Sequence, residues 1–237
     1  MKLNFGFSGK KEKTTGNMMQ RRQILNNNSG FVVREAYKTL RTNIHFALRG
    51  NACKKFCITS GTAGEGKSIT LLNLAISFAE SGQKVLLIDA DLRRPAIARL
   101  LVEKATPGLS NVLANLTGLE EAVRTEVYPN LDILFSGDVP PNPSELLGSE
   151  AFEKLIKELS ATYDYILVDV PPVNVVSDAC VVAKVLDGVL LLVRQERSTK
   201  ETVKQAVSNL QLVDAKILGY ILNGVTSIPK KNYGYYE

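Results

Sequence analysis

The chain has 237 residues, of which 45% are apolar and 22% are charged, and this composition suits one α/β domain with a sizeable core. No apolar run reaches the roughly 18 residues needed to cross a bilayer, and the basic N-terminus lacks the apolar stretch of a secretory signal. We therefore expect a cytoplasmic protein, held at a membrane only by a partner. Basic residues outnumber acidic ones by 29 to 24, and this small excess is weak evidence for nucleic acid and equally compatible with a membrane surface or an acidic partner. We expect no nucleic-acid partner.

The two ends of the chain differ in composition from its middle. Residues 1–30 are polar and rich in Lys, Asn, Gln and Gly, which predicts a disordered arm. Residues 31–226 alternate apolar and amphipathic stretches and are interpreted as one domain, and residues 227–237 return to a polar tail. Within the domain, apolar residues recur at helical spacing from about 32 to 49, so the first predicted element is a helix.

Apolar runs and helical stretches then alternate along the chain. The runs predict buried strands at 55–60, 84–89, 131–135, 164–170, 188–194 and 216–222. Two of the helices between them have recognisable starts: a cap followed by a first-turn proline at Asn142-Pro143-Ser144-Glu145, and a capping box at Ser198-Thr199-Lys200-Glu201. Strands separated by helices indicate a doubly wound, mostly parallel sheet with helices on both faces.

A glycine-rich loop follows the first predicted strand and leads into a helix, which is the context that a phosphate-binding Walker A loop requires. Its nucleotide-binding residues are Gly61, Thr62, Ala63, Gly64, Glu65, Gly66, Lys67, Ser68 and Ile69. Glycines let backbone N–H groups turn toward phosphates, and the helix N-terminus adds positive potential. Lys67 is expected to reach the β- and γ-phosphates, and the Ser68 hydroxyl is expected to bind Mg²⁺. The sequence therefore predicts a P-loop nucleotide-binding protein.

Three carboxylates follow two further strands. Asp89 and Asp91 come at the end of the second predicted strand, and Asp169 comes at the end of the fourth. Ligands of open α/β sheets bind outside the carboxyl ends of the strands, so we expect these side chains to converge on the loop. One or two of them would hold Mg²⁺ directly or through water, and another would act as a base or orient the nucleophile. A turn or helix cap is the alternative role of an Asp at a strand end.

The base specificity and the cysteines are less informative. The Asn-Lys-x-Asp element of guanine-binding proteins is absent, since the last strand ends in Leu222-Asn223-Gly224, and this favours ATP. Asn223 could contact the base, or it could belong to an Asn-Gly turn. Cys53, Cys57 and Cys180 have no metal-ligand spacing and are expected to be reduced and close to the core.

Together these motifs resemble the bacterial tyrosine kinases, and in particular their stand-alone cytoplasmic form in capsule and exopolysaccharide production. The resemblance covers about residues 31–237. It rests on the Walker A loop, Asp89-x-Asp91-x-Arg93, Asp169-x-Pro171 and a terminal tyrosine cluster. The stretch 137–147 is similar to the Pro-Asn-Pro segment of the family, and the stretch 34–43 is similar to its N-terminal oligomerisation helix.

The resemblance implies specific roles for these residues. Lys67 and Ser68 bind phosphate and Mg²⁺, Asp91 and Asp169 support the metal, and Asp89 positions or deprotonates the incoming tyrosine hydroxyl. The implied phosphate acceptors on a neighbouring subunit are Tyr233, Tyr235 and Tyr236. The helix 31–50 implies a ring-shaped homo-oligomer, with eight subunits as one candidate number, built through Glu35, Lys38 and Arg41.

The family also implies partners: a transmembrane activator of the polysaccharide co-polymerase type, which recruits the kinase to the inner face of the membrane, and a cognate tyrosine phosphatase. Two positions depart from the family pattern. Ala63 replaces a usual proline, which should loosen the loop, and Lys38 stands where Arg is usual and cannot form a bidentate fork. These departures remove no phosphate or metal ligand.

A different class of protein shares the fold and both Asp motifs: ATPase switches of the MinD and ParA type, which position or partition cargo. Those proteins usually carry an additional lysine early in the loop, and the corresponding stretch here, 60–64, has none. They also have no use for a tyrosine tail. The sequence therefore predicts an ATP-dependent tyrosine kinase, with the ATPase switch as the alternative.

Overall fold

The computed structural model describes residues 23–225, so the predicted acceptors Tyr233, Tyr235 and Tyr236 lie outside the described residues. The strands are β1 Lys54–Ser60, β2 Val85–Asp89, β3 Val123–Tyr128, β4 Leu131–Leu134, β5 Tyr165–Asp169, β6 Gly188–Arg194 and β7 Ile217–Asn223. The helices are α2 Phe31–Ala47, α3 Lys67–Ala79, α4 Ile97–Leu101, α5 Leu109–Leu113, α6 Leu119–Ala122, α7 Pro143–Leu147, α8 Glu150–Leu159, α9 Asp178–Ala183 and α10 Lys200–Gln211.

The strands form one sheet in the order β3-β4-β2-β5-β1-β6-β7, in which all pairs are parallel except β3 with β4. The six predicted strands and the doubly wound class are confirmed, with strand ends that differ by a residue or two. Strand β3 was not predicted. This strand is a half-buried edge strand that carries Arg124 and Glu126, and its pairing with β4 shifts register between Arg124 and Tyr128, so it shows no regular alternation.

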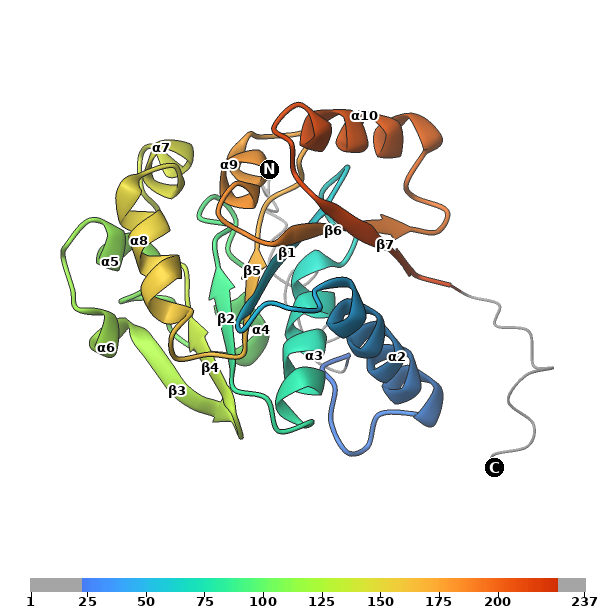
Figure 1. Ribbon diagram of the computed structural model, residues 1–237, viewed down its shortest axis with the longest axis horizontal. Coiled ribbons are helices and arrows are strands. Elements are labelled where there is room, and N and C mark those ends of the chain that lie inside the picture. Colours follow the sequence, from blue (N-terminus) through green and yellow to red (C-terminus); the bar gives the residue numbers. More distant parts are fainter. Residues whose placement is uncertain (1–22, 226–237) are drawn as a thin grey trace, which may run out of the picture.

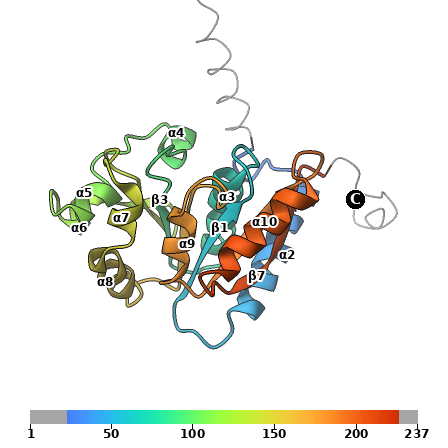
Figure 2. The same cartoon turned by 90° about the horizontal axis from the view of Figure 1, so that it is seen from above.

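Helices cover both faces of the sheet and enclose two separate apolar cores (Figure 1). Alternate residues of β1 supply both cores: Phe56 and Ile58 face the core that contains α2, α3 and α4, whereas Cys57 faces the core that contains α8, α9 and α10. Figure 2 shows α10 in front and α2 behind it, and these two helices belong to opposite faces of the sheet. Strands buried on both faces explain why their sequences are continuous apolar runs.

The first described residues correct one prediction. Residues 23–30, which we expected to belong to a disordered arm, lie against the domain: Leu25 is buried, and its backbone N–H donates to Asn73 Oδ1 at 2.8 Å. The Asn73 amide in turn donates to the carbonyl of Gln23 at 2.8 Å. The polar composition of this stretch hid its two apolar anchors, the buried Leu25 and the partly buried Ile24. The rest of the predicted arm, residues 1–22, lies outside the described residues.

The predicted oligomerisation residues lie on α2, which confirms the predicted helix. Lys38 Nζ and Glu35 Oε1 form an ion pair at 2.6 Å within the helix, three residues apart. Arg41 is half-buried, and its guanidinium donates to the backbone carbonyl of Ser77 on α3. Arg41 therefore connects α2 to α3 within the same chain. The contribution of all three residues to a ring stays a prediction.

The predicted helix starts have different outcomes. Asn142 is the N-cap of α7 and Pro143 its first residue, as predicted, although no side-chain hydrogen bond caps this helix. The predicted capping box of α10 is wrong by one position. Its N-cap is Thr199, whose Oγ1 accepts from the backbone N–H of Thr202 at 3.2 Å. The hydroxyl of Ser198 instead donates to Glu65 of the glycine-rich loop.

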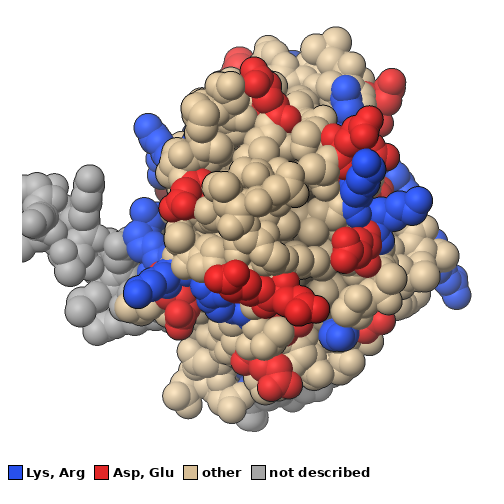
Figure 3. Space-filling view, turned by 90° about the vertical axis from the view of Figure 1, so that its left-hand side faces the viewer, with Lys and Arg blue, Asp and Glu red and all other residues tan. Residues whose placement is uncertain are grey.

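The surface agrees with the modest net charge. On the face in Figure 3, basic and acidic side chains lie interspersed around uncharged surface, so this face carries no continuous basic stripe of the kind that indicates nucleic-acid binding. Within residues 23–225, no helix is both long and apolar enough to span a bilayer.

Candidate active site

The carboxyl ends of β1, β2 and β5 meet at one edge of the sheet, because β5 lies between the other two strands. A cavity of about 520 Å³ opens there, a volume within the usual range for small-molecule sites. Its lining comes from the glycine-rich loop, the segment after β2 and the segment after β5: Ala63, Gly64, Gly66, Lys67, Ser68, Ile69, Asp91, Arg93, Arg94, Ala96, Arg99, Leu100, Pro171, Pro172, Val175 and Val176. The structure therefore brings most of the predicted site residues together.

The glycine-rich loop has the backbone conformation that its glycines permit. Gly64 has φ = 77° and Gly66 has φ = 101°, a left-handed region that favours glycine. α3 begins at Lys67, so the loop leads directly into a helix N-terminus, where N–H groups are available for anions. Lys67 is 7% exposed and lines the cavity together with Ser68. This geometry is that of a phosphate-binding loop.

Residues at and beyond the end of β6, the strand next to β1, hold this loop in place. Glu65 is fully buried, and its Oε1 accepts from the hydroxyls of Thr62 at 2.9 Å and Ser198 at 2.5 Å. The guanidinium groups of Arg194 and Arg197 donate to the Gly64 carbonyl at 3.3 Å and 3.1 Å. The segment between β6 and α10 thus fixes the loop through these hydrogen bonds, although it lies about 130 residues after the loop in the sequence.

Asn223, the predicted base contact, also braces the loop. Its Nδ2 donates to the Glu65 carbonyl at 2.9 Å, and its Oδ1 accepts from the backbone N–H of Gly224 at 2.8 Å. A Cβ on Gly66 would lie 2.5 Å from this Nδ2, and the φ of 101° at Gly66 favours glycine as well. Both ends of the amide are engaged in this structure, and the contact with the base stays a prediction.

Asp89 and Asp169 are cross-strand neighbours at the ends of β2 and β5, and both are fully buried. Burial raises the pKa of Asp169 to about 7, although the nearby Lys67 ammonium and Ser68 hydroxyl lower it. The pKa of Asp89 is also well above its ordinary value, first because of burial and then because of the Asp169 carboxylate. Two adjacent buried carboxyls without a cation disfavour each other's ionisation.

The hydrogen bonds of these carboxyls leave oxygen atoms unused. Asp89 Oδ2 accepts from the backbone N–H of Ile97 at 3.1 Å, which partly supports the cap interpretation, but its Oδ1 has no partner in the described part of the chain. Neither carboxylate oxygen of Asp169 has a hydrogen-bond partner among the described residues. Buried oxygens without partners are rare, because each costs about 1–3 kcal/mol.

These orphaned oxygens fit a divalent cation. Mg²⁺ prefers oxygen ligands and usually keeps several waters, so it needs few protein ligands. Ser68 and Asp91 line the cavity, with the buried Asp169 behind them, and all three carry oxygen donors. No cluster of three or more His, Cys, Asp or Glu side chains suited to a metal occurs in residues 23–225.

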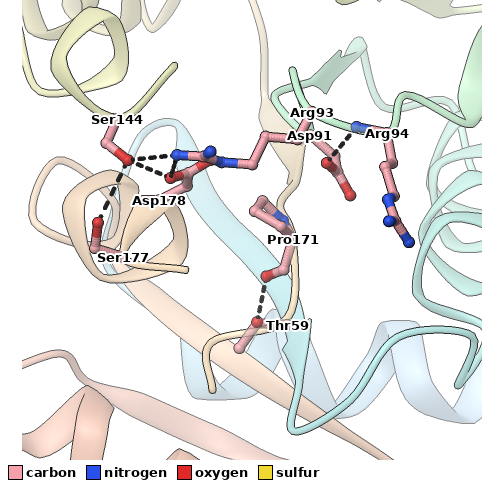
Figure 4. Close-up of polar contacts among 8 residues, drawn as sticks. All are labelled: Thr59, Asp91, Arg93, Arg94, Ser144, Pro171, Ser177 and Asp178. Atoms are coloured by element: carbon pink, nitrogen blue, oxygen red, sulfur yellow. Dashed lines mark hydrogen bonds and ion pairs between the residues drawn. The ribbon is translucent and has the colours of Figure 1, made fainter. Parts of the chain in front are cut away.

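The loop after β2 is anchored through a residue that the sequence analysis missed. Asp178, at the start of α9, is fully buried and accepts from Arg93 Nε at 2.9 Å and from Arg93 Nη2 at 3.1 Å. Ser144 of α7 joins them, accepting from Arg93 Nη2 at 3.0 Å and donating to Asp178 (Figure 4). Ser177-Asp178 before an apolar helix is a helix-start signal, but nothing in it identifies Arg93 as the partner.

The loop after β5 is held by the core of the sheet. Thr59 Oγ1 donates to the Pro171 carbonyl at 2.9 Å, which ties the end of β1 to the segment that follows Asp169 (Figure 4).

Cys53 and Cys57 are buried and Cys180 is half-buried, all as free thiols, in agreement with the prediction. None of the three lines the cavity.

Comparisons with known proteins agree with this geometry. The family model described as "AAA domain" matches residues 53–221. The tyrosine-protein kinase YwqD of Bacillus subtilis is 41% identical over 94% of this chain and 94% of its own length. The structure of the kinase domain of Escherichia coli tyrosine kinase ETK superposes with a TM-score of 0.79 at 36% identity, over 86% of this chain and 80% of that one.

The alternative class is a more distant match. The septum site-determining protein MinD of Pyrococcus horikoshii, solved with Mg-ADP, superposes with a TM-score of 0.62 at 28% identity, over 76% of this chain and 75% of that one. The likeness confirms the P-loop fold and nucleotide binding, whereas the kinases are more similar in both sequence and structure. The chain belongs to the AAA-domain family of P-loop proteins and, within it, to the bacterial tyrosine-protein kinases.

Proposed function

We propose that this tyrosine kinase transfers the γ-phosphoryl group of ATP to tyrosines of its own tail, Tyr233, Tyr235 and Tyr236, on a neighbouring subunit. The bond between the γ-phosphorus and the phenolic oxygen forms, the bond from that phosphorus to the β–γ bridging oxygen breaks, and ADP leaves. The phenolic proton passes to Asp89. The single observation that supports this proposal best is the cavity that joins Lys67 and Ser68 to the partly exposed Asp91.

The residues divide the chemistry between them. The loop N–H groups and Lys67 bind and orient the phosphates, since phosphoryl transfer depends mainly on positioning and on charge neutralisation. Ser68, Asp91 and Asp169 would hold Mg²⁺, which supplies positive charge at the β- and γ-phosphates when it is bound. Asp89 is the proposed base, and burial and the Asp169 carboxylate, which raise its pKa above the ordinary value, make it a stronger proton acceptor.

The setting of the reaction follows from the resemblance. We infer a ring-like homo-oligomer built through α2, with Glu35, Lys38 and Arg41 at the contacts, in which the tail of one subunit reaches the cavity of the next. A transmembrane activator would recruit the kinase from the cytoplasm to the inner face of the membrane, where it regulates capsular or exopolysaccharide synthesis and export. A cognate phosphatase would reverse the reaction.

Intact mass spectrometry after incubation with Mg·ATP tests the central proposal. The unmodified chain should gain up to three phosphates, all mapped to the tail tyrosines, and Lys67→Met should gain none. When Lys67→Met is mixed with a catalytically intact chain, its tail should become phosphorylated, because transfer occurs between subunits. ATP hydrolysis without tyrosine modification, even with the activator present, would instead support an ATPase switch.

A further inference from the structure

Two groups of residues with different chemistry line the cavity. Ala63, Gly64, Gly66, Lys67, Ser68 and Ile69 belong to the phosphate loop and the start of α3 and account for the nucleotide and its cation. The remaining lining comes from the segment between β2 and α4, from α4 itself and from the segment after β5. The second group is larger than coordination of a cation requires, and the proposed function assigns a role only to Asp91 within it.

Adjacent arginines in the second group differ in their partners. The Arg93 guanidinium is committed to the buried Asp178. The backbone N–H of Arg94 donates to Asp91 Oδ1 at 3.0 Å, which fixes where its side chain begins, but the exposed Arg94 guanidinium has no hydrogen bond or ion pair with the described residues. Figure 4 shows this guanidinium extending away from the Asp91 carboxylate. The Arg94 guanidinium therefore lines the cavity with its N–H donors unused by the described residues.

The charge of the lining favours an anionic ligand in addition to the nucleotide. Among the charged residues that line the cavity, Lys67, Arg93, Arg94 and Arg99 are basic and only Asp91 is acidic. Lys67 serves the nucleotide, Arg93 serves Asp178 and Arg99 has an interaction of its own in the structure, so Arg94 is the basic group with no assigned partner. A guanidinium can bind a carboxylate or a phosphate through two parallel hydrogen bonds.

The rest of the second group suits an aromatic ring. Pro171, Pro172, Val175 and Val176 form an apolar part of the lining, and Val175 is 64% exposed. The ring of an acceptor tyrosine would pack against these apolar residues, and an anionic group beside it would reach Arg94. A ligand that carries both is a tyrosine followed by an acidic residue. The proposed acceptor has this pattern in its sequence, because the charged residues around the tail are Lys230 and Lys231 before the tyrosines and Glu237 directly after Tyr236.

We propose that Arg94 is a specificity-determining residue of the acceptor side, which binds the anionic group of the residue that follows the acceptor tyrosine. The inference rests on the proposed function, since it takes the tail of a second copy as the acceptor. It also gives the reaction an order. Tyr236 is phosphorylated first, guided by Glu237, and its phosphate, with a charge of about −1.5 to −2, then guides Tyr235.

A trans-phosphorylation assay with two full-length chains tests this role. The donor chain carries Tyr233→Phe, Tyr235→Phe and Tyr236→Phe, so that it cannot modify itself. The acceptor chain carries Lys67→Met and keeps Tyr236 as its one tail tyrosine, followed by Glu237 or by Glu237→Gln. We expect the donor to phosphorylate the Glu237 acceptor about fivefold faster than the Glu237→Gln acceptor, the effect of one partly exposed charge pair.

Variants of the donor separate recognition from folding. Arg94→Gln should abolish the preference for Glu237, whereas Lys104→Gln, a nearby exposed residue that does not line the cavity, should retain it. Arg94→Glu should prefer an acceptor with Glu237→Lys, a reversal that a purely structural role would not produce. The KM for ATP should not change with the identity of residue 237.

The outcomes also distinguish this inference from the proposed function. Equal rates on the two acceptors with an active donor would overturn the role of Arg94 and leave tail phosphorylation intact. No phosphorylation of either acceptor, with the activator present, would overturn both. In the unmodified chain, time-resolved mapping should show phosphate on Tyr236 before Tyr235, and the opposite order would contradict the inference.

Discussion

The two loops that meet in the cavity are held by different kinds of interaction. The phosphate loop is braced from behind by hydrogen bonds to Glu65 and to the Gly64 carbonyl, and these come from the β6–α10 segment and the end of β7. The loop after β2 is anchored at one main point, where Arg93 meets the buried Asp178. The nucleotide side is thus fixed by the body of the sheet, whereas the acceptor side depends on helices α7 and α9.

This difference suits the two tasks of the enzyme. A nucleotide is the same at every turnover, so a rigid, preorganised loop binds it with little loss of conformational entropy. A peptide acceptor arrives from another chain, and the loop that receives it needs one firm anchor and an available side chain. Arg93 and Arg94, neighbours in the sequence, divide these two roles between them.

The largest expected effect is at the buried carboxylates, on which both loops converge. Asp169→Asn should lower the rate of tyrosine phosphorylation by at least about a hundredfold, because it removes a charge aimed at the phosphates and the cation. The same change should raise the free energy of unfolding of the nucleotide-free protein at pH 8 by about 2 kcal/mol, because the asparagine has no charge to bury. Kinetics and chemical denaturation measure the two effects.

The pH dependence of stability follows with a definite sign. Because the pKa of Asp169 is raised to about 7 in the native state, the folded chain holds a proton that the unfolded chain has released between about pH 4 and pH 7. This carboxyl therefore makes the nucleotide-free protein less stable as the pH rises through that range. Denaturation from pH 5 to pH 8 should show a decrease that Asp169→Asn reduces, and an unchanged slope in the variant would contradict this assignment.

The next effect tests the brace of the phosphate loop. Glu65→Ala removes the acceptor of the Thr62 and Ser198 hydroxyls, so the loop should lose its fixed conformation and its affinity for ATP should fall about tenfold. Glu196→Ala is the matched control, because Glu196 is an exposed glutamate of the β6–α10 segment, which also contains Ser198. This change should leave the affinity unchanged. Calorimetric titration with ATP measures both, and equal affinities would show that the brace does not contribute to binding.

The smallest effect concerns the anchor of the acceptor side. Asp178→Asn keeps the shape of the side chain but weakens its bidentate contact with Arg93, and should lower the free energy of unfolding by about 1 kcal/mol. Arg94→Gln should have no effect on stability, because the Arg94 guanidinium has no partner in the described structure. Parallel urea denaturation of the two variants tests the contrast, and equal destabilisation would contradict it.

The sequence alone predicted the elements that depend on local pattern. Buried parallel strands appear as apolar runs, and the glycine-rich loop has fixed spacing, so β1, the loop and the positions of Asp89, Asp91 and Asp169 were all predicted. The edge strand β3 was missed because half of its surface faces solvent and its register is irregular. Ile24 and Leu25 were missed because two adjacent apolar residues in a polar stretch produce no periodic signal.

Only the tertiary structure decided which partners these residues have. Ser198 was assigned to a helix cap, but folding places its hydroxyl on Glu65. For Asn223 the sequence left open a base contact or an Asn-Gly turn, and the structure adds a hydrogen bond to the backbone of the phosphate loop. Asp178 gave no functional signal until it was found beside Arg93. Motif spacing determines the groups that must contact the phosphates, because that chemistry is local. The groups that hold them come from strands and helices far away in the chain, and only the sheet topology brings them together.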